Sequence, residues 1–199
     1  MVCSACSRTR TIPSLAPAAR WPSWRRTALR SSTSSSPTAR RVARTYKDGH
    51  LAPDLKLRRD IVRMIRKHKP ELVITHIPGR VLDAPMGGSH PDHIAVGEAT
   101  MAAVYPDSRN PRAFRSLLKQ GFAPHIVNEV WIPYWTLGDY FVDISKTLDL
   151  KLAALKKHKS QVAKPGQEWD VDKWIRKRHR DIGKKSGYTY AESFKRIKV

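Results

Sequence analysis

The sequence has little cysteine and no long apolar segment. Cys3 and Cys6 are the two cysteines among 199 residues, which excludes a disulfide framework and a zinc site built from cysteine alone. No apolar run approaches the roughly 18 residues that a membrane-spanning helix needs. Hydrophobic residues make up 40% of the chain, enough for one folded core. We therefore expect a protein without a membrane span and with a cytoplasmic location.

Acidic residues are absent from the first 47 positions. This segment holds ten of the 38 lysines and arginines and none of the 17 acidic residues, and Ser31–Ser36 is a nearly unbroken run of hydroxyl side chains. It shows neither helical nor alternating apolar periodicity, so residues 1–45 are expected to be disordered as written. A transit peptide or a basic arm that binds polyanions would each explain the composition. Residues 46–199 have the patterning of a folded domain.

Residues 46–199 combine helical and strand patterns. Helices are expected at residues 54–67, 92–104, 113–120, 147–157, 169–180 and 190–197, and strands at 72–75, 126–132 and 140–144. In the first helix, Leu55, Ile61, Val62 and Ile65 form an apolar stripe, and the arginines, Arg66 included, are expected in solvent. A helix–strand–loop–helix order followed by further strands indicates an α/β fold with a mainly parallel sheet.

The motif His90-Pro91-Asp92-His93 follows a strand and a glycine-rich loop and opens a predicted helix. In α/β sheets, ligands bind beyond the ends of the strands. Two imidazoles that flank a carboxylate can supply a metal ligand, a supporting carboxylate and a proton-handling group. The alternative is a helix N-terminus capped by Ser89 or Asp92 with solvent-exposed histidines. His76, at the end of the preceding strand, either faces the same site or is a loop histidine without a role, and we favour the second interpretation.

A wider set of segments resembles one enzyme family. The stretch VITHIPGR…GGSHPDHIAVGEAT is similar to the second signature of the PIG-L/LmbE family of zinc-dependent N-acetylglucosaminyl deacetylases. YKDG, VYPDSRNPRAF, EVWI, FVDISKTLDLKLAALKKHKSQ and the closing YAESF resemble its bacterial branch, so that the resemblance covers about residues 46–199. It implies a Rossmann-like LmbE fold, with a mainly parallel sheet flanked by helices, whose N-terminal strand and helix are missing or disordered here.

The resemblance also implies roles for individual residues. His93 would be a zinc ligand, His90 would stabilise an oxyanion or assist proton transfer, and Asp92 would support them. Asp48 would bind sugar hydroxyls, although a simple turn residue before Gly49 is the competing interpretation.

The implied reaction is zinc-dependent hydrolysis of the amide C–N bond of an N-acetylglucosamine-containing conjugate, with Zn²⁺ activating a water molecule. The expected partner is therefore a small N-acetylated sugar conjugate, and we do not expect nucleic acid to be one. The sequence does not give the oligomeric state.

The family's other signature, A-H-P-D-D, is absent, and with it a His ligand, an Asp ligand and the general base. Residues 8–22, RTRTIPSLAPAARWP, can encode it one base out of register. If each shifted codon takes the third base of one codon and the first two bases of the next, these residues can be read as A-H-P-D-D-P-E-F-G-A-G-G-T-V-A. We therefore hypothesise that residues 1 to about 41 are an out-of-frame translation, which would also explain the missing acids.

The chain as written offers one firm zinc ligand, His93. A catalytic zinc site needs about three protein ligands and an open position for water. We therefore expect weak or no zinc binding and little activity from this chain. A catalytically inactive relative and a basic polyanion-binding protein are the two alternatives, the second resting on the basic N-terminal segment and the basic helix at 169–180.

Overall fold

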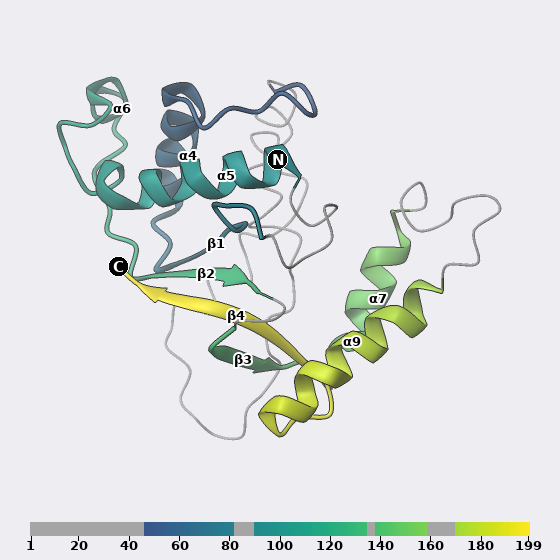
Figure 1. Ribbon diagram of the computed structural model, residues 1–199. Coiled ribbons are helices and arrows are strands. Elements are labelled where there is room, and N and C mark those ends of the chain that lie inside the picture. Colours follow the sequence, from purple (N-terminus) through teal and green to yellow (C-terminus); the bar gives the residue numbers. More distant parts are fainter. Residues whose placement is uncertain (1–45, 82–89, 135–137, 159–169) are drawn as a thin grey trace. The chain divides into compact units, whose positions relative to one another are not determined.

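The computed structural model of the chain describes residues 46–81, 90–134, 138–158 and 170–199 (Figure 1). These residues form two compact units, one made of residues 46–133 with 196–199 and the other of residues 134–195. The expected disorder of residues 1–45 and their out-of-frame origin fall outside the described residues. None of the helices described is both long enough and apolar enough to cross a membrane.

Helix α4 (Leu55–His68) confirms the first predicted helix. The carboxylate of Asp54 caps it by accepting a hydrogen bond from the backbone N–H of Leu57 at 2.8 Å. The buried apolar residues are Leu57, Ile61, Val62 and Ile65. Two predictions for this helix are wrong. Leu55 is 65% exposed because the buried stripe begins at Leu57, and Arg66 is 1% exposed rather than solvated.

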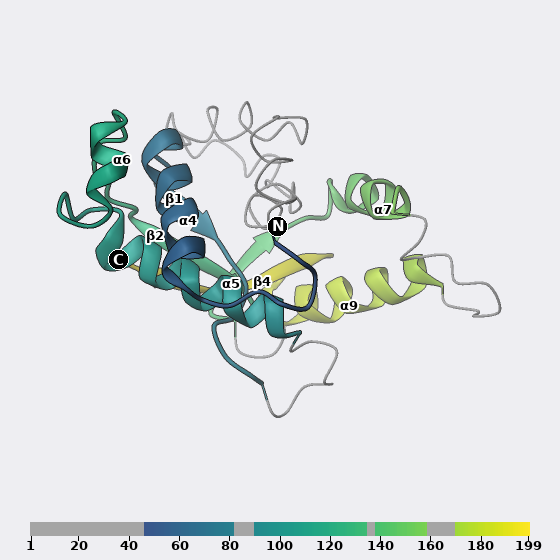
Figure 2. The same cartoon turned by 90° about the horizontal axis from the view of Figure 1, so that it is seen from above.

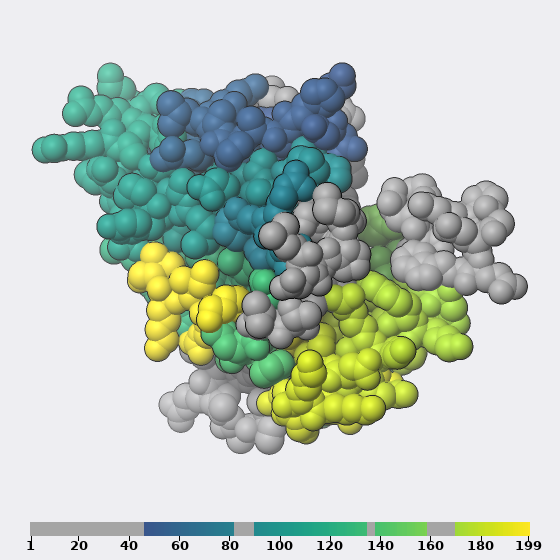
Figure 3. All heavy atoms as spheres, viewed as in Figure 1, coloured from purple at the N-terminus to yellow at the C-terminus, as the bar shows by residue number. Residues whose placement is uncertain are grey.

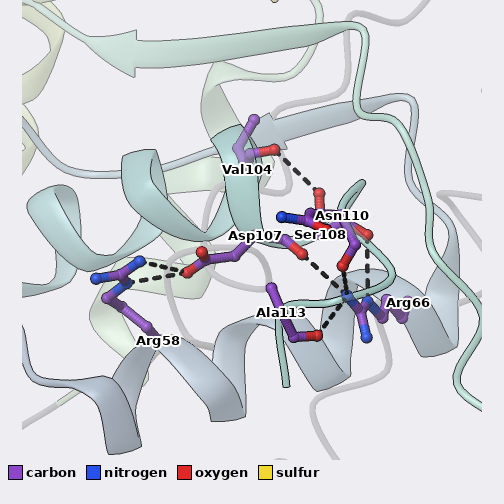
Figure 4. A network of polar contacts seen from close by, with 7 residues as sticks. All are labelled: Arg58, Arg66, Val104, Asp107, Ser108, Asn110 and Ala113. Carbon is purple, nitrogen blue, oxygen red and sulfur yellow. Dashed lines mark hydrogen bonds and ion pairs between the residues drawn. The ribbon is translucent and has the colours of Figure 1, made fainter. Parts of the chain in front are cut away.

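Arg66 is buried because backbone carbonyls surround its guanidinium group (Figure 4). Its Nε donates to the carbonyl of Ser108 at 3.1 Å, and its Nη2 donates to three further carbonyls of the same loop, those of Asp107, Asn110 and Ala113. Beside it, Arg58 donates from Nε and Nη2 to Oδ2 of Asp107 at 2.9 and 2.8 Å. The two arginines therefore fasten residues 107–113 to α4.

The first unit contains a parallel strand pair covered by helices. Strands β1 (Leu72–Ile74) and β2 (Glu129–Pro133) are parallel, with Val73 opposite Val130. The helices after β1 are α5 (Pro91–Ala102), the π-helical segment η2 (Ala103–Asp107) and the short α6 (Arg115–Lys119).

Helix α4 packs against α5 and η2, as the view from above shows (Figure 2). In the space-filling view the surface of the chain from Tyr46 through α4, in blue, lies directly against that of α5, in teal (Figure 3). The C-terminal residues belong to the same unit, since the N–H of Val199 donates to the carbonyl of Asn128 at 3.0 Å and Arg196 pairs with Glu129.

The second unit contains an antiparallel strand pair and two helices. Strands β3 (Tyr140–Asp143) and β4 (Ala191–Lys198) are antiparallel, with Tyr140 opposite Phe194. Helices α7 (Leu148–Lys156) and α9 (Val171–Ser186) carry ion pairs from Lys156 to Asp172 and from Arg176 to Asp149. The buried apolar residues of this unit are Val142, Ile144, Leu148, Leu152, Val171, Ile175, Ala191 and Phe194.

The predicted helix at residues 190–197 is wrong, because this segment is strand β4. Its residues Ala191 to Phe194 are buried on both faces, and the buried Glu192 is paired with Lys151 of α7. A segment buried on two sides loses the alternation that marks a half-exposed strand. The α/β class is confirmed. The described strands include the parallel pair of β1 and β2 and the antiparallel pair of β3 and β4.

Candidate active site

The N-terminus of α5 is built by the predicted HPDH motif. His90 is the capping residue, and Pro91 occupies the first turn, where its missing N–H costs nothing. The His90 Nδ1 accepts a hydrogen bond from the backbone N–H of Asp92 at 3.2 Å. The expectation of a cap by Ser89 or Asp92 is therefore wrong. A nitrogen that accepts carries no proton, so the geometry assigns the ring proton of a neutral His90 to Nε2, where it can be donated to a ligand.

Asp92 is buried, and each of its two carboxylate oxygens accepts a hydrogen bond. It is 1% exposed, its Oδ2 accepts from the backbone N–H of Gly49 at 2.8 Å, and its Oδ1 accepts from that of Leu51 at 3.1 Å. Burial acts to raise the pKa of this carboxyl, but the two N–H groups and the imidazoles of His90 and His93 outweigh burial and hold the pKa below its usual value. Asp92 is therefore a fixed anion that joins two segments rather than a group that exchanges protons.

The segment that Asp92 holds carries Asp48. The N–H of His50 donates to the carbonyl of Lys47 at 3.2 Å, and Gly49 has a φ of 78°, a left-handed conformation that suits glycine. Asp48 lies exposed in this turn, close enough to His93 for its charge to oppose in part the lowering of the pKa of that imidazole. Asp48 is thus a turn residue and also a neighbour of the HPDH motif.

The structure adds His76 to this cluster. Its ring stacks on that of His93, with centroids 4.2 Å apart and an angle of 12° between the planes, while His90 lies 5.3 Å from His93. Burial, with a smaller contribution from His93, lowers the pKa of His76 to about 4. Whether His76 has a role stays untested, but the structure places its ring against the HPDH motif. The signal available in the sequence was its position directly after a buried strand.

His93 lies between the two other imidazoles. Burial and then His90 lower its pKa, while Asp92 and Asp48 act in the opposite direction, and the net shift is downward. A histidine whose pKa lies below its ordinary value near 6.5 is neutral at pH 7. His93 therefore presents a neutral imidazole, the form that binds metals and accepts protons.

These side chains do not make a complete metal site. Within the part of the chain that the structure describes, no three His, Cys, Asp or Glu side chains come together in a way that could hold a metal ion. Both oxygens of Asp92 already accept hydrogen bonds from backbone N–H groups, those of Gly49 and Leu51. The described residues therefore do not fit the expected zinc ion by themselves, and Cys3 and Cys6 lie outside them.

Comparisons with known proteins identify the family of the chain. The sequence profile of the PIG-L family, described as GlcNAc-PI de-N-acetylase, matches residues 23–104, which include the HPDH motif. The match begins inside the segment hypothesised to be out of frame, so it does not support a shifted frame for residues 23–41. A diacetylchitobiose deacetylase of Thermococcus kodakarensis is 34% identical over 151 residues, or 75% of this chain. The chain belongs to the PIG-L family.

Two further relatives are named as deacetylases. A Bacillus subtilis protein named "Probable N-acetyl-alpha-D-glucosaminyl L-malate deacetylase 2" is 30% identical over 95 residues, which is 47% of this chain and 36% of that protein. The structure of N,N'-diacetylchitobiose deacetylase from Pyrococcus horikoshii matches with a TM-score of 0.66 and 28% identity, covering 77% of this chain and 55% of that one. The chain spans 54% of the Thermococcus protein, so about half of the relative's length has a counterpart here.

Proposed function

We propose that this PIG-L family chain carries part of the active site of an N-deacetylase for an N-acetylglucosamine-containing conjugate. The observation that carries the proposal is the cluster of His90, His93 and His76 at the N-terminus of α5, with the Asp48 turn fastened beside it by Asp92. The names of the relatives support it, since one is a diacetylchitobiose deacetylase and the other is named a probable N-acetylglucosaminyl malate deacetylase.

Three residues of the site are given roles in the proposed hydrolysis. Water adds to the acetamide carbonyl, the C–N bond breaks, the amine gains a proton, and acetate leaves. The Nε2–H of His90 donates to the oxyanion that forms on the carbonyl oxygen, and the partial positive charge at the N-terminus of α5 adds to this stabilisation. Asp48 binds sugar hydroxyls, and Asp92 keeps the Asp48 turn next to the two histidines.

The missing half of the site is proposed to lie in the shifted reading frame of residues 8–22. The A-H-P-D-D peptide would contribute an Asp as general base, and a His and a second Asp as zinc ligands. These two ligands and His93 make the three ligands that a catalytic zinc ion requires. A bound zinc ion would supply a water of lowered pKa. The chain as written lacks these groups and is proposed to be impaired.

The test compares acetate and free amine released from N,N'-diacetylchitobiose and from an N-acetylglucosaminyl malate. The frame-restored chain, in which residues 8–41 are read one base earlier, should release both products in equal amounts, and the chain as written should stay near background. In the frame-restored chain His90→Ala should lose about a hundredfold in kcat, the usual cost of one oxyanion donor. His68→Ala, an exposed histidine at the end of α4, is the matched control and should change nothing. Absence of release by a folded frame-restored chain would refute the proposal.

The basic helix α9 does not favour the polyanion-binding alternative. Arg176 pairs with Asp149, and Arg180 donates to the hydroxyl of Tyr190 at 2.9 Å. The guanidinium of Arg178 lies over the ring of Trp174, 5.3 Å from its centroid. Several of the arginines that suggested polyanion binding thus interact with other side chains of the second unit. Steeply salt-dependent DNA binding by the chain would reverse this preference.

A further inference from the structure

Gly97 lies at a close contact between α5 and the end of β1. A Cβ atom placed on Gly97 would lie 2.6 Å from the carbonyl oxygen of His76 and 2.7 Å from that of Ile77. Both atoms belong to the backbone, so no side-chain rotation can make room. An ordinary contact begins at 3.4 Å, and a methyl group would therefore push the two segments apart by about 0.8 Å.

The same contact sets the spacing of two imidazoles. Gly97 follows His93 by four residues, so both lie on the same face of α5. This face meets residues 76 and 77, and the ring of His76 lies flat on that of His93 with centroids 4.2 Å apart. The flat stack restricts the rotation of the His93 ring, and the stack exists only if the backbone beyond β1 can approach the helix this closely.

We propose that Gly97 is a positioning residue of the active site, which acts by letting His76 stack on His93 and so fixes the plane of the His93 ring. The role of His93 in the reaction rests on the function proposed above, whereas the positioning can be tested without activity. If Gly97 served packing alone, its replacement would weaken folding and leave the geometry of the two rings in the folded fraction unchanged.

The structural arm of the test uses the full chain as written, with ¹³C,¹⁵N-labelled histidine, at pH 7.5. The native chain should show ring-to-ring nuclear Overhauser effects between His76 and His93. Gly97→Ala should weaken them and shift the His93 ring resonances. Gly79→Ala is the matched control, because Gly79 lies in the loop that carries His76 and has no atom within 4 Å of an added Cβ. It should leave the ring-to-ring effects and the His93 ring resonances unchanged.

A second pair of variants leaves Gly97 intact and decides the question if Gly97→Ala does not fold. His76→Phe keeps a flat ring at the position and should preserve most of the His93 ring shifts, whereas His76→Ala should change them. Equal His93 spectra for the Phe and Ala variants would overturn the proposal, as would a Gly97→Ala spectrum identical to that of Gly79→Ala.

The activity arm uses the frame-restored chain. Misplacing a reacting group by about 1 Å can cost up to about a hundredfold in rate, so Gly97→Ala should lower kcat by at least about tenfold and change KM little. His76→Phe should retain more activity than His76→Ala. If the frame-restored chain has no activity with any variant, the proposed function fails while the spectra still decide the positioning role.

Discussion

Asp92 offers the sharpest test of how the site is assembled. Its two carboxylate oxygens accept the N–H groups of Gly49 and Leu51, and the side chain is 1% exposed. We consider two changes, Asp92→Asn and Asp92→Ala. Asp92→Asn keeps the shape of the side chain, but only one of its two end groups is still an oxygen that can accept a hydrogen bond. The other end group becomes an NH₂ that faces one of the two backbone N–H groups. Asp92→Ala removes both acceptors.

The expected loss of unfolding free energy follows from how deeply the N–H groups of Gly49 and Leu51 are buried. Gly49 is exposed, so its N–H can bind water when the carboxylate is lost, whereas Leu51 is 8% exposed and its N–H cannot. A hydrogen bond to a charged group contributes about 1.5–3 kcal/mol, and a buried unsatisfied donor costs about 1–3 kcal/mol. Asp92→Asn should therefore lower the free energy of unfolding by about 1.5 kcal/mol, and Asp92→Ala by about 3 kcal/mol.

The assay is urea unfolding of the full chain, followed by circular dichroism at several pH values. Because the pKa of Asp92 is lower in the folded chain than in the unfolded one, its stabilising effect is complete above the unfolded value near 3.9 and fades as the pH falls through the folded value. The difference between the native chain and Asp92→Asn should therefore be constant near pH 7 and shrink below about pH 4. The control is Asp48→Asn in the exposed turn, with an expected change within about 0.5 kcal/mol. If Asp92→Asn also changed the free energy of unfolding by no more than about 0.5 kcal/mol at pH 7, Asp92 would not hold the Asp48 turn as described.

Three further predictions concern other buried polar groups. Arg66→Met removes the donor for four backbone carbonyls and should lower the free energy of unfolding in urea by about 3 kcal/mol, and a loss under 1 kcal/mol would contradict the buried network. Lys151→Met removes the ion pair that Lys151 makes with the buried Glu192 and should cost about 3 kcal/mol in the same assay, whereas the exposed Lys157→Met should cost almost nothing. The ring of His76 should titrate near pH 4 by nuclear magnetic resonance, and a value near 6.5 would contradict its burial. Since the unfolded chain takes up this proton below about pH 6.5 and the folded chain does so near pH 4, stability should fall as the pH drops between these values, and less so in His76→Phe.

Local sequence signals predicted the elements that frame the site. The apolar spacing in α4, the β-branched run of β1 and the proline in the first turn of α5 are each legible in a few neighbouring residues. These three elements place the HPDH motif beyond a strand and at a helix N-terminus. The resemblance to the PIG-L family, built on segments distributed along residues 46–199, was confirmed by the comparisons.

Contacts between distant segments could not be predicted in the same way. Arg66 occupies a position that helical periodicity assigns to solvent, and its burial depends on a loop more than 40 residues later that folds over it. The stack of His76 on His93 depends on the approach that Gly97 permits. Strand β4 was mistaken for a helix because burial on both faces, with Glu192 neutralised by Lys151, removed the alternating pattern.

We propose that half of the active site is in frame while the other half is encoded one base out of register. Sequencing the codons for residues 7–11 tests it most directly. The account predicts that the codons of Arg8 and Arg10 begin with CG and that the third bases from Ser7 to Thr11 are G, C, C, G and G, so that the shifted frame spells Ala-His-Pro-Asp-Asp. A different third base in the codon of Arg10 or Thr11 would remove one of the two aspartates and contradict the account.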